Sequence, residues 1–128
     1  MTEGICPSGW HIPSDGEFTE LTDFLGGEGV AGGKMKEAGY DHWYSPNEGA
    51  TNSSGWTGLP GGSRWAQLGG YEGHFTQKNK VGKWWSASES GYGAWFRSMD
   101  RYNVWFISPS SSQDYLHAGY SARCVRDD

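Results

Sequence analysis

Four histidines and two cysteines are the side chains of this sequence that most often bind metal ions in proteins. They are His11, His42, His74 and His117, together with Cys6 and Cys124. The histidines are scattered without a His-x-x-x-His spacing, and two cysteines are too few for a structural zinc site. We therefore expect no metal site and no cofactor. A structural calcium ion is left open, although no motif indicates one.

Nucleophilic and phosphate chemistry have no recognisable motif either. No Gly-x-Ser-x-Gly turn is present, and no spacing of carboxylates suggests an acid–base pair. The pairs Gly26-Gly27 and Gly32-Gly33 lack the Lys-Ser or Lys-Thr that completes a phosphate-binding loop. The sequence therefore favours a binding module over an enzyme.

Aromatic residues are the strongest remaining signal. Half of the 20 aromatic residues lie between Trp84 and Tyr120, interleaved with Ser, Gly, Asp, Asn and Arg, a mixture typical of antibody combining sites. We expect about half of these rings to form the core, with Trp84, Trp85, Trp95 and Tyr120 foremost. Tyr92, Tyr102, Phe106 and Tyr115 lie beside turn residues and are expected to be exposed. The predicted ligand-binding residues are Tyr92, Phe96, Arg97, Arg101, Tyr102, Trp105, Phe106, Ser110, Gln113, Tyr115 and His117.

Size and composition predict one folded domain that is rich in loops. The chain has 128 residues, 21 of them Gly, and a mean hydropathy of −0.72, but its aromatic content of 16 % argues against disorder. A net charge of −5 opposes binding to nucleic-acid backbones. No apolar run is long enough to cross a membrane, and the first residues lack the features of a signal peptide. The protein therefore either stays inside the cell or has lost a leader.

Local patterns predict two helices and several short strands. Ser14 and Glu17 have the spacing of a capping box, and an apolar repeat follows until Gly26-Gly27, which predicts a helix. A second, shorter helix is predicted over 30–37, weakened by Gly32 and Gly33. Residues 39–80 read as loop, with Trp43, Trp56 and Trp65 fixing it to the core. Strands are predicted over 83–88, 94–99, 104–107 and 119–126, and Arg97 and Met99 should face away from Phe96.

The two cysteines lie near the two ends of the chain, which leaves two interpretations. They are either unrelated buried thiols or a disulfide that joins the ends. A disulfide is favoured because small Gly-rich domains often need a covalent link, and it would imply an oxidising compartment.

Six sequence blocks resemble the Fibrobacter succinogenes major paralogous domain, in order along essentially the whole chain. The blocks are CPSGWHIPS at 6–14, VAGGKMKE at 30–37, ATNSSGW at 50–56, LPGG at 59–62, WWSASE at 84–89 and YSARCVRD at 120–127. The resemblance implies one α+β domain over 1–128 with a C-type lectin-like fold: two helices, a small twisted antiparallel sheet and long irregular loops. In that fold, which is related to the fold of formylglycine-generating enzymes, both chain ends meet in one sheet. Family members are typically secreted or bacterial surface proteins.

Similar domains also serve as the variable proteins of diversity-generating retroelements, in which adenine-directed mutagenesis rewrites codons near the C-terminus. Residues 104–119 depart from the family pattern, as a diversified surface would. Trp105 and Gln113 cannot arise from mutated Asn codons, so they belong to the scaffold or count against this mechanism. The sugar-and-calcium motifs of animal C-type lectins are absent, and Ser45-Pro46-Asn47 resembles them only weakly. The copper-binding cysteine pair of formylglycine-generating enzymes is absent too.

These observations predict an extracellular or surface-displayed module that binds a protein ligand on another cell or surface. The alternative is a carbohydrate-binding adhesin domain that uses the same face and Trp43 or Trp65 against a glycan. A third interpretation is an enzyme on the formylglycine-generating scaffold, for which no constellation of residues is recognisable. A fourth is a structural spacer within a longer surface protein. No nucleic acid and no transmembrane segment are expected.

Overall fold

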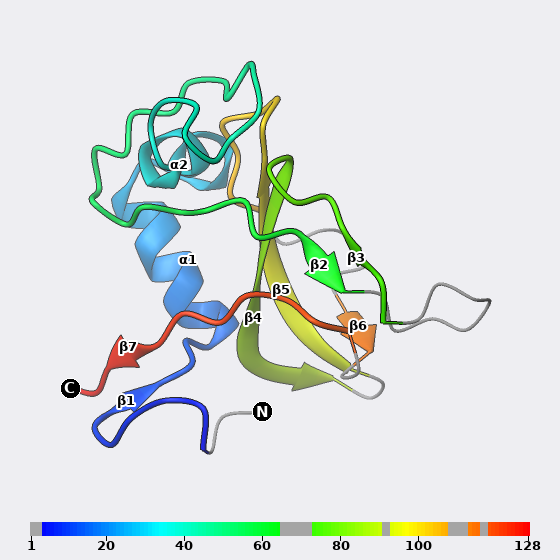
Figure 1. Cartoon of the computed structure of the whole chain (residues 1–128). Helices are drawn as coiled ribbons and strands as arrows, with labels where there is room; N and C mark the ends of the chain where they lie inside the picture. Colours follow the sequence, from blue (N-terminus) through cyan, green and yellow to red (C-terminus); the bar gives the residue numbers. More distant parts are fainter. Residues whose placement is uncertain (1–3, 65–72, 91–92, 108–112, 116–117) are drawn as a thin grey trace.

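The computed structural model describes residues 4–64, 73–90, 93–107, 113–115 and 118–128. Two helices cover one face of the longest sheet, and irregular segments connect them to it (Figure 1). The elements, in chain order, are β1 (Trp10–His11), α1 (Asp15–Phe24), α2 (Glu28–Met35), β2 (Ser63–Arg64), β3 (Phe75–Thr76), β4 (Val81–Ser90), β5 (Gly93–Asp100), β6 (Gln113–Tyr115) and β7 (Val125–Arg126). The described chain is therefore α+β, with two helices and small antiparallel sheets, as predicted.

Helix α1 begins where the capping box predicts. The Ser14 hydroxyl accepts a hydrogen bond from the Glu17 amide, and the Glu17 carboxylate accepts one from the Ser14 amide. Phe18 and Thr22 are buried, and the helix ends at Phe24. Gly26 and Gly27 follow this end, and their positive φ angles of 107° and 111° suit glycine. Helix α2 also forms, shifted by two residues toward the N-terminus from the prediction.

Strand β5 is the central strand of the longest sheet, between β4 and β6, and side chains are packed on both faces of this sheet. Val81 pairs with Asp100 and Trp85 with Phe96 in an antiparallel register. The predicted alternation in β5 is confirmed: Met99 packs with the helices, while Phe96 packs with Trp85 on the opposite face. Apolar burial on both faces explains why this sheet needs few aliphatic residues.

Residues 104–107 do not form the predicted strand. The amide of Gly33 in α2 donates to the Val104 carbonyl, and the Phe106 amide donates to the Glu28 carbonyl, so this segment bonds to helix α2. Only Ile107 makes an isolated bridge, to Ser98. The strand predicted over 119–126 is likewise shorter, since continuous pairing is confined to Val125–Arg126.

A disulfide joins Cys6 to Cys124, so the alternative of two unrelated thiols is wrong. Beside it, β1 pairs antiparallel with β7, and both lie at the lower end of the molecule in Figure 1. The two ends of the domain are thus held together both by backbone hydrogen bonds and by a covalent link.

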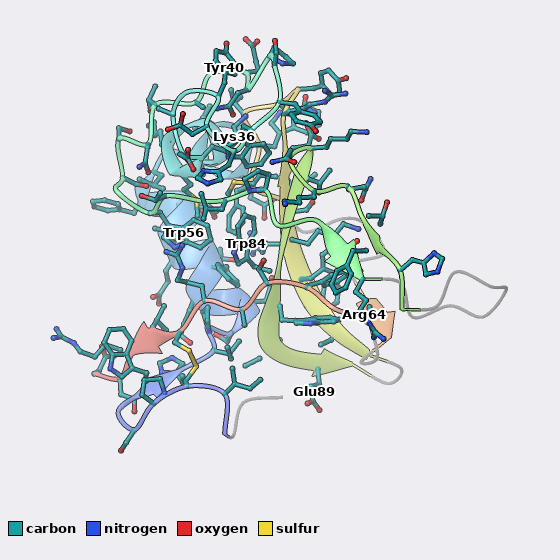
Figure 2. All side chains as sticks on the ribbon, viewed as in Figure 1. Lys36, Tyr40, Trp56, Arg64, Trp84 and Glu89 are labelled. Carbon is teal, nitrogen blue, oxygen red and sulfur yellow. A yellow bond between two sulfur atoms is a disulfide. The ribbon has the colours of Figure 1, made fainter. Side chains whose placement is uncertain are left out.

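The main core lies between the helices and the sheet. It contains Phe18, Met35, Trp84, Met99 and Phe106, and Trp56 packs against it at the position shown in Figure 2. Of the described helices, neither has the length and apolar character that crossing a membrane requires.

Candidate functional site

Strand β5 separates the predicted ligand-binding residues into two groups. Arg101 and Tyr102 follow its end at Asp100, whereas Gln113 and Tyr115 pair with Trp95 and Gly93 at its start. Eight extended residues span about 23 Å at roughly 3.3 Å per residue. The predicted residues therefore do not form one continuous patch. Tyr92, Ser110 and His117 lie outside the described residues, and only the backbone is described for Gln113 and Tyr115.

Three of the predicted contact residues are buried, which corrects the expectation that they face a ligand. Phe106 is 0 % exposed because its backbone bond to α2 turns the ring into the core, where it contacts Phe18, Trp56 and Trp84. Phe96 is buried on the opposite face, where its ring packs with those of Trp85 and Tyr120. Phe106 therefore shows that a position beside turn residues does not by itself make a ring exposed.

Arg97 is buried under the helices and connects them to the sheet. Its guanidinium donates to the carboxylates of Asp15 and Glu28 at 2.9 and 3.2 Å, and to the Thr19 hydroxyl at 2.8 Å. Because its buried charge is paired and hydrogen-bonded within the protein, Arg97 serves to hold the fold together. Arg97 has no accessible surface for a ligand.

Exposed aromatic residues gather instead where two loops meet beyond the end of β5. We define the loop-end surface as Tyr40, Tyr44, Arg101 and Tyr102, whose three rings are 67 %, 51 % and 59 % exposed. The Arg101 guanidinium lies 4.5 Å from the centre of the Tyr102 ring and donates to the Ser45 carbonyl at 3.3 Å. From the other side, the Tyr40 hydroxyl donates to the Pro46 carbonyl at 3.4 Å. The Ser45-Pro46 turn therefore joins the two loops into one surface.

Sequence reasoning identified half of this surface. Arg101 and Tyr102 are among the predicted ligand-binding residues, and the exposure expected of Tyr102 is confirmed. Trp105, another predicted ligand-binding residue, is 46 % exposed. Tyr40 and Tyr44 were missed, although Gly39 and Ser45-Pro46 beside them are the same kind of turn signal. The missing information was spatial: nothing in the sequence places residues 40–48 beside residues 100–103.

Polar groups beneath the loop-end surface hold the two loops together. The Glu48 amide donates to the Arg101 carbonyl at 2.8 Å, and the Asn47 side chain donates to the carbonyls of Glu37 and Gly39. The Lys36 ammonium is fully buried under the same loops, below Tyr40 in Figure 2. Trp43, a candidate for glycan contact, is fully buried, and its indole donates to the Gly58 carbonyl, so it is unavailable to a ligand. Trp65 lies outside the described residues.

Two buried polar atoms at the base of this surface have no hydrogen-bond partner among the described residues. They are the Asn47 Oδ1 and the Arg101 Nε. Buried polar groups are nearly always paired in folded proteins, so these two atoms are exceptions at the base of the surface. Arg101 is thus partly buried at its Nε, while its guanidinium lies over the exposed Tyr102 ring.

Two hollows lie away from the loop-end surface. One, of about 230 Å³, is bordered by Arg64, Phe75 and Tyr120, with Phe75 81 % exposed. The other, of about 460 Å³, lies between α1 and β7 and includes Leu21 and Val125 among its lining residues. In the part of the chain that the structure describes, no cluster of three or more His, Cys, Asp or Glu could hold a metal ion.

Comparison with known proteins gives one match. The model of the Fibrobacter succinogenes major domain matches residues 1–126. No curated protein and no solved structure matches the chain.

Proposed function

Because the chain belongs to the Fibrobacter succinogenes major domain family, we propose that it is a ligand-binding module with a C-type lectin-like fold rather than an enzyme. In this proposal the domain is secreted or displayed at a surface and binds a protein through the loop-end surface. Pairing of β1 with β7, two helices on one face of the sheet and the long irregular segment between α2 and β2 support the proposed fold.

The observation that carries the proposal is the contact of the Arg101 guanidinium with the exposed Tyr102 ring, together with the exposed rings of Tyr40 and Tyr44 on the loop to which Arg101 donates. Tyrosine and arginine are enriched among the residues that contribute most to binding at protein interfaces. Tyrosine buries a large ring with few freely rotating bonds, and the planar guanidinium of arginine offers several hydrogen-bond donors and stacks on aromatic rings. A monomer gains no stability from holding three tyrosine rings in water, so their grouping favours an interface.

An oxidising location fits this proposal. Disulfides persist in extracellular and periplasmic compartments and are rare in the cytosol. The Cys6–Cys124 link is therefore compatible with an extracellular domain.

Diversification by a retroelement is a further part of the proposal. Tyr102 and Arg101 are residue types that mutated Asn codons can produce, whereas Trp105 is not. Tyr40 and Tyr44 lie outside the C-terminal third and would be constant contacts beside varied ones. A reverse transcriptase gene beside a near-copy of the final third of this gene would support diversification, and its absence from the neighbourhood would count against it.

Selection of binders from a random peptide library on phage tests the proposed surface without knowledge of the natural ligand. Peptides selected on the wild-type protein should lose binding to the Tyr102→Ala variant and retain binding to Trp10→Ala, which removes an exposed ring from β1 at the other end of the molecule. Enriched peptides that bind Tyr102→Ala as tightly as the wild type would contradict the proposed surface.

A carbohydrate ligand is the second candidate, and the hollow beside Phe75 favours it. The exposed Phe75 ring and the Arg64 side chain both line this hollow, so it offers an apolar face and hydrogen-bond donors to a sugar. Saturable binding on a glycan array that is lost in Phe75→Ala, but kept in Tyr102→Ala, would favour this function. A negative array would favour the protein ligand.

A further inference from the structure

Lys36 places a fully buried ammonium group between the two loops that carry the loop-end surface. It caps the C-terminal end of α2, and its side chain runs under both loops. The ammonium donates to the carbonyls of Glu48, Asp100 and Asn103 at 2.8, 3.1 and 2.8 Å. One of these carbonyls, that of Glu48, belongs to the loop that follows α2. The Asp100 carbonyl lies at the last residue of β5, and the Asn103 carbonyl lies in the turn that follows it.

The three acceptors match the three donors of a lysine ammonium, so the group is saturated. The Trp43 ring, with its centre 5.5 Å from Nζ, adds a cation–π contact. Burial disfavours the charged form and lowers the pKa of Lys36 to about 8, and the carboxylates of Asp100 and Glu48 partly offset this by attracting the charge. The Asp100 carboxylate is itself held by the Tyr102 amide and the Asn103 side chain.

Three carbonyl oxygens that converge on one point repel one another unless a cation lies between them. Each of the three carbonyls belongs to a residue that is close in sequence to a member of the loop-end surface. Glu48 follows Tyr44, and Asp100 and Asn103 flank Arg101 and Tyr102. We propose that the Lys36 ammonium is the internal cation that positions the loop-end surface, holding the Tyr40–Glu48 loop against the Arg101–Asn103 turn. The use of this surface for binding rests on the proposed function, whereas the positioning can be measured without any ligand.

The primary experiment compares amide hydrogen exchange in the wild type, Lys36→Met and Lys34→Met. Methionine has a similar length but no charge and no donor. Lys34 is a matched control on the same helix, because its ammonium donates to one carbonyl, that of Leu25, at the end of α1. In Lys36→Met the amides of Glu48 and Arg101 should lose protection about tenfold or more, as expected for lost hydrogen bonds to a charged donor. The Ala87 amide, which bonds to Pro13 in another part of the fold, should be unaffected.

Chemical rescue separates a positioning cation from a side chain that merely fills space. The Lys36→Ala variant lacks the atoms of n-propylammonium, so adding that ion should restore protection at Glu48 and Arg101, while propan-1-ol of similar size should not. Equal rescue by the neutral alcohol, or unchanged protection in Lys36→Met, would overturn the proposal.

The wild-type protein provides a test if neither variant folds. Above a pH of about 8 a neutral Lys36 amine keeps two donors for three carbonyls. Protection at Glu48 and Arg101, corrected for the intrinsic exchange rate, should then fall relative to protection at Ala87. Protection that stays parallel at all three amides would overturn the proposal. If the loops loosen as expected but selected peptides ignore the loop-end surface, the positioning stands and the proposed function fails.

Discussion

The ring of Phe106 meets the ring of Phe18 edge to face, with 5.4 Å between their centres and 71° between their planes. This contact joins helix α1 to the segment that carries the exposed turn Arg101–Trp105. Aromatic pairs in this geometry stabilise beyond the area they bury. The turn is thus connected to the core only a few residues beyond the rings that it exposes.

Replacement of Phe106 by alanine should destabilise the domain strongly. The variant loses contacts with Phe18 and Trp84 and leaves a cavity, for an expected loss of about 3–5 kcal/mol in the free energy of unfolding. Tyr102→Ala, which removes a mostly exposed ring, should change it by less than about 0.5 kcal/mol. Denaturant unfolding measures both, and equal losses in the two variants would contradict the assigned burial.

Alanine at Gly32 should prevent helix α2 from packing. A Cβ atom there would lie 2.0 Å from the Trp105 carbonyl oxygen, closer than any real contact, and backbone atoms cannot rotate away. Gly29→Ala is the matched control in the same helix, where a Cβ meets nothing within 4 Å. We expect Gly32→Ala to lower the melting temperature markedly, and Gly29→Ala to leave it unchanged or raise it slightly. Similar melting temperatures for the two variants would contradict the close approach of the Trp105 backbone to Gly32.

The stability contributed by His11 should depend on pH. Hydrogen bonds to Asp127 and then Glu17 raise the pKa of His11 above its ordinary value of 6.5. Since the folded state binds the proton more tightly, the contribution is complete below about pH 6.5 and is lost as the pH rises through the raised pKa. The melting temperature of His11→Gln should thus differ most from the wild type near pH 6, and least in alkaline buffer. A difference in melting temperature that grows as the pH rises would contradict the raised pKa of His11.

Reduction of the disulfide should destabilise the fold without removing its main core. The bond spans 118 residues, and the chain-entropy model gives about 4–5 kcal/mol for so long a loop. Unfolding in denaturant with and without reductant measures this loss. The double variant Cys6→Ser/Cys124→Ser should be insensitive to reductant, and a wild-type midpoint that reductant leaves unchanged would argue against the link.

Local sequence signals predicted the elements whose stabilising contacts are themselves local. The capping box of Ser14 and Glu17 lies within one helical turn, so α1 follows directly from the sequence. The alternation of Phe96 with Arg97 and Met99 is likewise a property of a single strand.

Long-range backbone contacts determined what the sequence could not predict. The apolar run 104–107 has the same pattern whether its amides bond to a strand or to a helix, and it bonds to α2 because Gly32 and Gly33 let the backbone approach. The loop-end surface escaped prediction for the same reason. Tyr40 and Tyr102 come together through the Ser45-Pro46 turn and Arg101, a contact that no periodicity encodes.

The pairing of β1 with β7 determines how the domain would be presented to its surroundings. Both strands lie at the end of the molecule opposite Tyr40 (Figures 1 and 2). A tether attached through either strand would leave the loop-end surface pointing away from the point of attachment. Fusion to a carrier at residue 128 should therefore keep the loop-end surface accessible when ligands are screened.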